Sequence, residues 1–468
     1  MINFFSTTEK DIERNFLLII KVTFFLVLNF LVFYLVYSNA NILNTFEDEI
    51  ISLASNYNFF TSLNFDARPL IPVNYGVGLT SGPLSAIGGV IGWGLSKSFI
   101  VARISNFYYV FLLQVIFSYF LAKQYKLDLK KFIIFSSIQI LLVPWWIGSL
   151  YSIGEVASTI IFVNSLFLYS KNKNLSLILF SSSIIYGKFL LVVPFTAFYI
   201  SNLLISRFDR RKLVTILKDF FIFSVPFLVW YLLIILKTGI NNFLLYINEF
   251  IGFIFYYQDS GFESAREFSL NLILKQITES EVSVWSSASL LRTLIAPLLF
   301  GIVLYRNKDE INKKFEIKII SILFSVYSTY LWFWLLSPTK YIRHTKHFTI
   351  IIIFVLFYCL IADAVSSNFD KLIIISLISL FFSDLFLIII FNILIYTLFF
   401  IKLNKKTKNV VMNILFSGFL ILNIVIGVYE SNLKQRVDLN FPECSDSLTI
   451  EKCYTSYLYF DLYTGEKK

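Results

Sequence analysis

Long apolar runs recur from one end of this chain to the other, and they limit the fold more than any other feature. Thirteen runs can be marked off, at 15–38, 98–122, 132–148, 153–170, 175–187, 189–206, 213–236, 291–305, 317–336, 348–366, 372–383, 385–401 and 410–428. Hydrophobic residues make up 57% of the chain and charged residues 15%. In lipid the backbone satisfies its hydrogen bonds only in helices or closed barrels. We therefore predict an all-α polytopic membrane protein with about 11–13 transmembrane helices, each of about 20 residues.

Two pairs of runs are short for a membrane span. They are split at Gly187-Lys188 and at Ser383-Asp384. Each pair fits either a re-entrant hairpin or two full crossings, so the span count around 175–206 and 372–401 stays open.

Basic residues orient the helices. They cluster between apolar runs, as "KQYKLDLKK" (123–131), "RFDRRK" (207–212), "RNKDEINKK" (306–314) and "KLNKKTK" (402–408). Cytoplasmic loops of membrane proteins are rich in Lys and Arg, so we place these loops in the cytoplasm. They also account for the net charge of +10 without a nucleic-acid partner.

This orientation divides the chain into a transmembrane domain, 1–430, and a short outer tail, 431–468. Two large outer loops are predicted, at 39–97 and 237–290. Long ordered loops are uncommon unless they have a function.

The first outer loop opens with three consecutive carboxylates. The stretch "FEDEIISLASNYNFF" fits a short amphipathic helix lying on the membrane, with Glu47, Asp48 and Glu49 in its first turn. Stabilising the helix dipole explains any one of the three. As a group, however, carboxylates at the boundary of water and lipid can have tuned pKa values and can meet a lipid-borne substrate.

A late outer loop breaks the charge rule. "SPTKYIRHTKH" (337–347) carries Lys340, Arg343 and Lys346 on the side where such charge is sparse. A bound anion would explain the cluster. If a helix starts within this stretch, Arg343 and Lys346 share a face. Anchoring at the headgroups is the alternative.

Other isolated charges have simpler explanations, with one exception. Arg103 near the outer end of a span can snorkel to the headgroups, and Glu155 can cap the helix that it opens. Arg68 can pair with Asp66 or reach a substrate. Lys188 lies between two short apolar runs, and a Lys at the centre of a membrane helix costs about 2.5–3.5 kcal/mol. We therefore favour a functional role for Lys188.

The polar tail carries two cysteines. Cys444 and Cys453 are close in sequence, and an outer tail lies in an oxidising compartment. We predict a disulfide between them.

The order of these features resembles the GT-C superfamily of membrane glycosyltransferases, which take sugars from polyprenyl-phosphate carriers. The likeness runs through "FEDE", "TSGPL", Arg103, "GE" at 154–155, "YGKFLLVVP" and "KYIRHTKH". The resemblance implies an acidic base in the first outer loop, where Asp48-Glu49 stands. It also implies inversion at the anomeric carbon and a lipid-linked or cell-surface glycan as acceptor. Some members use a divalent metal, although nothing in this sequence indicates a metal site.

The chemistry of such a transfer assigns roles to the charged residues. A base must take the proton of the acceptor hydroxyl, and Asp48 is our choice, with Glu47 and Glu49 as substitutes or helpers. Cations must stabilise the departing phosphate. The candidates for that role are Arg343, Lys346, Lys188, Arg103 and His344. Arg68 and Glu155 are candidates for contact with the substrates.

Within the superfamily, the chain looks most like the serotype-converting O-antigen glucosyltransferases of phages and bacteria. It has no "WWD" motif, and its late motif reads "YIRH" without the following proline usual in the superfamily. This narrower likeness implies a bacterial inner membrane, an active site that faces outward, and a donor synthase and a flippase as partners.

Three rival functions stay open. An O-antigen polymerase should carry several arginines in its large outer loops, but Arg266 is the only one in 237–290. A transporter or flippase should show an internal duplication and charges deep within spans. No duplication is visible, and Asp363 and Asp384 are the acids closest to such positions. A non-catalytic membrane scaffold is the third.

Overall fold

The structure is a computed structural model. It describes residues 27–41, 47–62, 81–129, 138–139, 142–205, 210–256, 291–337, 345–382, 384–401, 405–433 and 460–461. These residues form helices joined by short turns, apart from one isolated bridge between Ser81 and Lys188. The prediction of an all-α polytopic membrane protein is confirmed, since three of the helices are long and apolar enough to cross a membrane.

The helices follow the predicted apolar runs closely. The first half of the chain contains a helix over 27–41, then α2 (Glu47–Ser62), α4 (Ile87–Ser96), α5 (Phe99–Gln124), α7 (Val143–Leu150), α8 (Glu155–Leu168), α9 (Lys173–Ile185), α10 (Val192–Ile205), α11 (Arg210–Thr238) and α12 (Ile240–Tyr256). The second half contains α15 (Ala296–Arg306), α16 (Lys308–Phe315), α17 (Ile319–Leu331), α18 (Lys346–Ile361), α19 (Asn368–Ser379), α20 (Leu385–Phe400) and α21 (Lys405–Leu433).

Short irregular helices interrupt this pattern at four places. Two are 3-10 turns, η1 (Pro83–Ser85) and η2 (Phe189–Leu191). Two are π-helical, η5 (Leu291–Ile295) before α15 and η6 (Trp332–Leu336) after α17. The pair of runs split at Gly187-Lys188 is thus a hairpin of α9 and α10 around η2.

Polar side chains begin several helices where the apolar pattern starts. The side chains of Ser98, Asn172, Ser367 and Asp384 each accept a hydrogen bond from the backbone N–H three residues later. Such caps satisfy one of the free donors of the first turn. Asp384 is therefore at a helix end. Asp363 is also outside the helices: it follows α18 and lies near Lys371, with its side chain 73% exposed.

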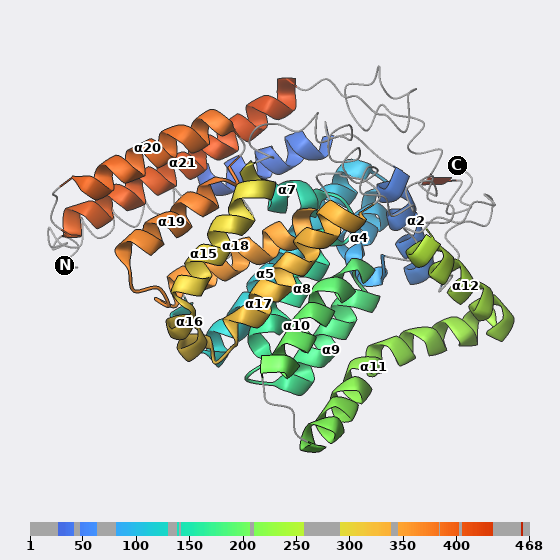
Figure 1. Ribbon diagram of the computed structural model, residues 1–468. Coiled ribbons are helices and arrows are strands. Elements are labelled where there is room, and N and C mark those ends of the chain that lie inside the picture. The colour runs from blue at the N-terminus through green and yellow to red at the C-terminus, as the bar shows by residue number, and fades with distance from the viewer. Residues whose placement is uncertain are drawn as a thin grey trace, which may run out of the picture.

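The helix bundle is built around α8 and α18, which lie in its interior (Figure 1). Every residue of α8 and nearly every residue of α18 is buried. The antiparallel α20 and α21 form one flank, and α11 with α12 forms the opposite flank. Polar side chains inside the bundle bond between helices, since the Tyr358 hydroxyl donates to Asn164 Oδ1 at 2.9 Å. Such bonds satisfy polar groups that lipid would leave unpaired.

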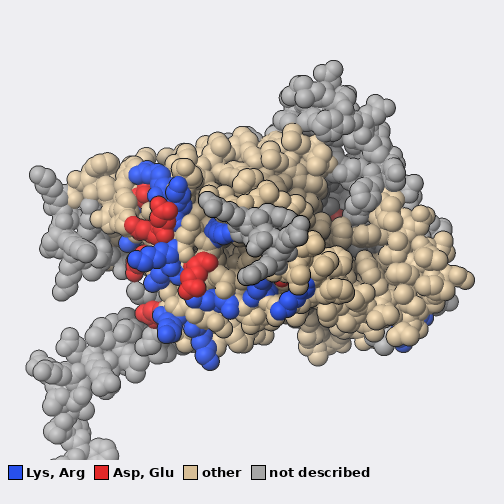
Figure 2. Space-filling model, turned by 60° about the horizontal axis from the view of Figure 1, so that its bottom comes forward, with Lys and Arg blue, Asp and Glu red and all other residues tan. Residues whose placement is uncertain are grey.

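Charged side chains gather at one end of the bundle (Figure 2). Lys171 pairs with Glu316, Lys173 with Asp219, and Arg306 with Asp370. Arg306 and Glu316 belong to or border the 306–314 loop that we assigned to the cytoplasm.

Tyr125 joins three segments at this charged end. Its hydroxyl lies 2.6 Å from the carbonyl oxygen of Phe167 and 2.8 Å from that of Phe315. Burial, opposed by a hydrogen bond with Ser170 and assisted by the charge of Glu316, raises the pKa of Tyr125 to about 12. The hydroxyl therefore remains a donor at neutral pH and fixes the ends of α5, α8 and α16 to one another.

The helix α2 forms where it was predicted, and protein covers most of its faces. Residues 49–54 are all buried, and Ile50, Ile51 and Leu53 pack with Trp93 of α4. Because protein encloses the helix on most sides, its apolar residues are spread around it and do not define a single face.

Thiol labelling in intact cells tests the orientation. Phe60 near the end of α2 and Asp128 after α5 are both exposed, at opposite ends of the bundle. Phe60→Cys should react with a membrane-impermeant maleimide, and Asp128→Cys should react only after permeabilisation, because basic loops stay in the cytoplasm. Labelling of Asp128→Cys in intact cells would reverse the topology. Cys359 is buried and provides the unreactive background among the described residues.

Candidate functional site

A buried ion pair connects α2 to the start of α5. Arg103 Nε donates to Glu49 Oε1 at 2.8 Å and Nη2 donates to Oε2 at 2.6 Å. Nη1 donates to the carbonyl oxygen of Ala40 at 2.8 Å. Both side chains are almost fully buried. Two parallel bonds between a guanidinium and a carboxylate are strong and directional, so this pair fixes the first turn of α2.

The loop between α7 and α8 lies beside this pair. Asn106 of α5 donates to the carbonyl oxygens of Ser149 and Tyr151, and Ser52 of α2 donates to that of Ser152. Gly154 then takes φ +77°. Any other residue would be strained there, and its Cβ would stand 2.0 Å from the Cβ of Ser85. The "GE" motif therefore needs its glycine for the turn that opens α8.

A second buried ion pair joins α8 to α18. Lys346 Nζ lies 3.0 Å from Glu155 Oε2, and the two side chains are 10% and 2% exposed. These residues are the first of their helices, and they are 191 positions apart in sequence. The ring of Tyr151 lies between the two pairs. Arg103 Cζ is 5.0 Å and Lys346 Nζ is 5.9 Å from its centroid, within cation–π range.

The "TSGPL" and "YGKF" motifs contact each other at the same end. Gly82 N donates to the carbonyl oxygen of Gly187 at 2.8 Å, and Leu84 N donates to that of Tyr186 at 2.7 Å. Lys188 Nζ donates to Ser81 Oγ at 2.8 Å. The segment 81–86 therefore connects the α9–α10 hairpin to the turn before α8, and it brings Lys188 to the end of the bundle that carries Glu155.

His347 is a member of this cluster that the sequence did not single out. It follows Lys346 in α18 and is 1% exposed. Its Nδ1 lies 3.1 Å from Thr159 Oγ1, and Thr159 in turn donates to the carbonyl oxygen of Glu155. Nε2 has no hydrogen-bond partner among the described residues. The one signal for His347 in the sequence was that it directly follows Lys346, whereas the predicted candidate was His344, which directly follows Arg343.

The predicted site residues therefore separate into three groups. Glu49, Arg103, Glu155, Lys188 and Lys346 lie in one cluster of linked contacts. Asp48 is in the first turn of α2 with its side chain half-buried, and Glu47 begins that helix. The remaining predictions lie outside the described residues, and these are Arg68, Arg343, His344 and the disulfide between Cys444 and Cys453.

Two predicted roles are occupied by protein partners in this structure. Arg103, a candidate for the phosphate, donates to Glu49 and Ala40 rather than pointing its charge to the headgroups. Glu155, a candidate for substrate contact, bonds to Lys346. Among the described residues, no group of three or more His, Cys, Asp and Glu side chains could hold a metal ion.

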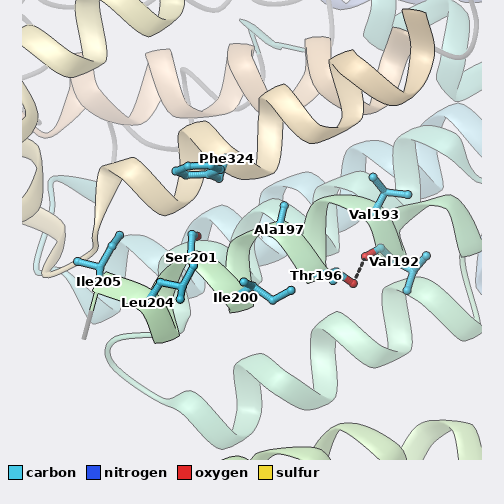
Figure 3. A pocket seen from close by; sticks show the side chains of 9 residues that line it. All are labelled: Val192, Val193, Thr196, Ala197, Ile200, Ser201, Leu204, Ile205 and Phe324. Atoms are coloured by element: carbon cyan, nitrogen blue, oxygen red, sulfur yellow. Dashed lines mark hydrogen bonds between the residues drawn. The ribbon is translucent and has the colours of Figure 1, made fainter. Parts of the chain in front are cut away.

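An apolar groove of about 590 Å³ opens on the flank of the bundle between α10 and α17 (Figure 3). Phe324 of α17 faces a row of α10 side chains that extends from Val192 to Ile205. The hydroxyl of Thr196 donates to the carbonyl oxygen of Val192 in its own helix. The groove thus begins four residues after Lys188, separated from it only by η2.

Comparisons with known proteins found two similar solved structures, both of ArnT from Cupriavidus metallidurans. One is in the apo state and the other is bound to undecaprenyl phosphate. Each is 12% identical to this chain, and the match covers 95% of this chain and 77% of the ArnT chain. The TM-score is 0.49 for the apo structure and 0.47 for the bound one. No family model and no curated protein matches the sequence.

Breaking the pair between Glu49 and Arg103 should destabilise the protein. Arg103→Met leaves a buried carboxylate without its partner, which typically costs about 3–5 kcal/mol. Thermal unfolding in detergent, followed by tryptophan fluorescence, measures the loss. The control is Lys171→Met, whose pair with Glu316 is partly exposed and should contribute only about 0–1 kcal/mol.

The double variant Glu49→Gln/Arg103→Met distinguishes the ion pair from simple packing. Removal of both charges should restore part of the stability lost in Arg103→Met, because no buried charge remains unpaired. Equal losses in Arg103→Met and Lys171→Met would show that the pair does not fix α2.

Proposed function

We propose that this protein is a GT-C type glycosyltransferase that moves a sugar from a polyprenyl-phosphate carrier to a hydroxyl acceptor. The observation that carries the proposal is convergence. The "FEDE" helix, Arg103, "TSGPL", "GE", "YGKF" and the end of "KYIRHTKH" are far apart in sequence, yet all meet at one end of the bundle. Charged and polar groups gathered at a membrane boundary mark a functional site more often than a structural one.

Asp48 is the carboxylate that we assign as the general base. Neighbouring residues of a helix point in directions about 100° apart, so Asp48 projects in a different direction from the one in which Glu49 meets Arg103. Glu49 is buried, and both of its oxygens accept bonds from Arg103. It is therefore removed from contact with an acceptor. Asp48 is adjacent and half-buried, and the pair between Glu49 and Arg103 would hold it in position.

The cations of the cluster fit the charge that develops on the carrier. In the transfer, the acceptor oxygen forms a bond to C1 of the sugar and gives its proton to Asp48. The bond between C1 and the phosphate oxygen breaks, and its electron pair stays on the phosphate. The phosphate changes from a singly charged diester to a doubly charged monoester. Lys188 and Lys346, with Arg343, are the residues that we assign to this charge.

The groove between α10 and α17 suits the isoprenoid chain of the carrier. Its lining is apolar along α10, and it begins near Lys188. The 14 residues of α10 extend about 21 Å at 1.5 Å per residue, which is enough for several isoprene units. A phosphate at Lys188 with its chain in this groove would leave the sugar at the outer end of the bundle.

The finer identity of the substrates follows from the sequence resemblance. It favours an O-antigen or another lipid-linked or cell-surface glycan as acceptor, and an outward-facing active site in a bacterial inner membrane. The two acids that a transporter would use have ordinary explanations here, because the Asp363 side chain is 73% exposed and Asp384 caps α20. The outer segment 257–290, on which a polymerase would depend, lies outside the described residues.

The direct test is carrier release. Purified protein is incubated with a panel of polyprenyl-phosphate sugars and an acceptor lipid extract, and free polyprenyl phosphate is measured by mass spectrometry. Asp48→Asn should lower turnover by about a hundredfold or more, because a general base contributes about 10²–10⁴-fold. Binding of the donor should persist.

Two further variants identify the base. Glu47→Gln should be close to wild type, and Glu316→Gln at the opposite end of the bundle is the matched control for loss of a carboxylate. Full activity in Asp48→Asn would reduce the "FEDE" carboxylates to helix-capping groups. A large loss only in Glu47→Gln would move the role of base to Glu47.

Arg343 gives a separate prediction. Arg binds phosphate through two parallel bonds, whereas Lys acts as a single point charge. Arg343→Lys should therefore weaken donor binding and turnover, and Arg343→Ala should weaken both further. Lys340→Ala is the control from the same loop and should have a smaller effect. If Arg343→Lys keeps full activity and donor affinity, Arg343 only anchors the loop at the headgroups.

A further inference from the structure

The ion pair between Glu155 and Lys346 is placed where a helix would favour an anion. Lys346 is the first residue of α18, and the N-terminal end of a helix carries partial positive charge. A lysine there is unfavourable unless a negative group accompanies it. In this structure Glu155 is that group, at 3.0 Å from Lys346 Nζ.

Apolar packing also holds α8 and α18 together. Both helices are buried along their whole length by apolar side chains such as Ile160, Phe167, Ile353 and Phe354. Buried ion pairs can often be replaced by apolar residues without loss of stability. Glu155 and Lys346 therefore call for an explanation other than packing.

His347 adds an independent observation at the same helix end. Thr159 uses its hydroxyl proton to reach the carbonyl oxygen of Glu155, so its oxygen accepts a bond from His347 Nδ1. Nε2 is then left with a lone pair in the neutral ring or a proton in the charged ring. It is buried and has no partner among the described residues. A phosphate beside Lys346 would accept that proton from the charged ring.

We infer that Glu155 competes with the carrier phosphate for Lys346. In the free protein the carboxylate neutralises Lys346. When the carrier binds, its phosphate takes Lys346 in place of the carboxylate and accepts a bond from Nε2 of the protonated His347, whose positive charge balances the displaced carboxylate. This inference rests on the proposed function, and it assigns His347 and Glu155 roles in holding and releasing the carrier.

Competition of this kind serves product release. The phosphate gains a negative charge in the transfer, so a cationic site holds the spent carrier more tightly than the donor. A carboxylate that returns to Lys346 opposes that gain. Glu155 is thus a positioning residue, and its removal should slow turnover by making the product leave slowly rather than by impairing the chemical step.

The test measures binding of polyprenyl phosphate and of inorganic phosphate to the full-length protein in nanodiscs. Glu155→Gln should bind polyprenyl phosphate about tenfold more tightly than wild type, a change of about 1.4 kcal/mol. Inorganic phosphate should shift in the same direction, because the competition concerns the phosphate and not the isoprenoid chain. Under multiple turnover, kcat should fall while a single turnover keeps its rate.

Matched variants separate this mechanism from a loss of structure. Glu316→Gln removes a carboxylate from the pair with Lys171 at the other end of the bundle and should change neither affinity. Lys346→Met should weaken phosphate binding. Adding Glu155→Gln to Lys346→Met should not tighten binding further. His347→Gln should weaken phosphate binding. In the His347→Gln background, Glu155→Gln should still tighten binding by the same factor, because Lys346 is still present. If Glu155→Gln fails to fold, Glu155→Asp withdraws the carboxylate by one methylene and should tighten binding in part.

The outcomes distinguish this inference from the proposed function. If the wild-type protein does not bind polyprenyl phosphate, the proposed function fails. If it binds, but folded Glu155→Gln and Glu155→Asp bind with equal or lower affinity, Glu155 is not a competitor and the inference is overturned. Tightening that persists in the Lys346→Met background would also overturn it.

Discussion

A charge inside a membrane protein must be paired or must reach water, and this constraint arranges the whole molecule. The interiors of α8 and α18 contain no charged residue beyond their first turns. At one end, pairs such as Lys171 with Glu316 are partly exposed, as expected for a surface in contact with water. At the other end, the pairs of Glu49 with Arg103 and of Glu155 with Lys346 are buried. The charges at one end are therefore paired and in contact with water, whereas those at the other end are paired inside the protein.

This contrast explains which parts of the fold could be predicted. Apolar runs determine helices locally, since each run needs only lipid or other apolar side chains around it. The helices α8, α9, α10 and α20 accordingly begin within a few residues of the predicted positions. The environment of α2 could not be predicted in the same way. Its burial depends on α4 and α5, and "IISLAS" at 50–55 reads equally well as a membrane-surface face or as a buried turn.

The members of the site were found more readily than their partners. Lys188 stood out because a lone charge near lipid is costly, and Lys346 because its basic segment breaks the charge rule. The choice of Glu155 as the partner of Lys346 has no local signal, because 191 positions separate the two residues. Arg103 shows the same limit. Snorkelling was the simpler expectation for it, yet Glu49 of another helix binds it inside the protein. Sequence identifies residues that need a partner, and only the fold supplies the partner.

The depth of the cluster follows from helix lengths. The helices that connect it to the charged end are short: α8 has 14 residues, α9 has 13 and α18 has 16. At 1.5 Å per residue they extend about 20–24 Å, whereas the hydrocarbon core is about 30 Å thick. On the topology that we predict, with the exposed pairs at the cytoplasmic boundary, Glu155, Lys188 and Lys346 would lie several ångströms below the outer boundary.

At that depth an unpaired lysine is costly, and so is the phosphate of a lipid carrier. Each can offset the burial of the other, but only while both are present. A carboxylate that occupies the lysine between turnovers solves the problem for the empty site. The same reasoning explains why Arg103, which already has two bonds to Glu49 and one to Ala40, is a poorer choice for the phosphate. Its release would break three bonds at once and also free the helix that carries Asp48. A lysine with a single bond to its partner can exchange that partner at much lower cost.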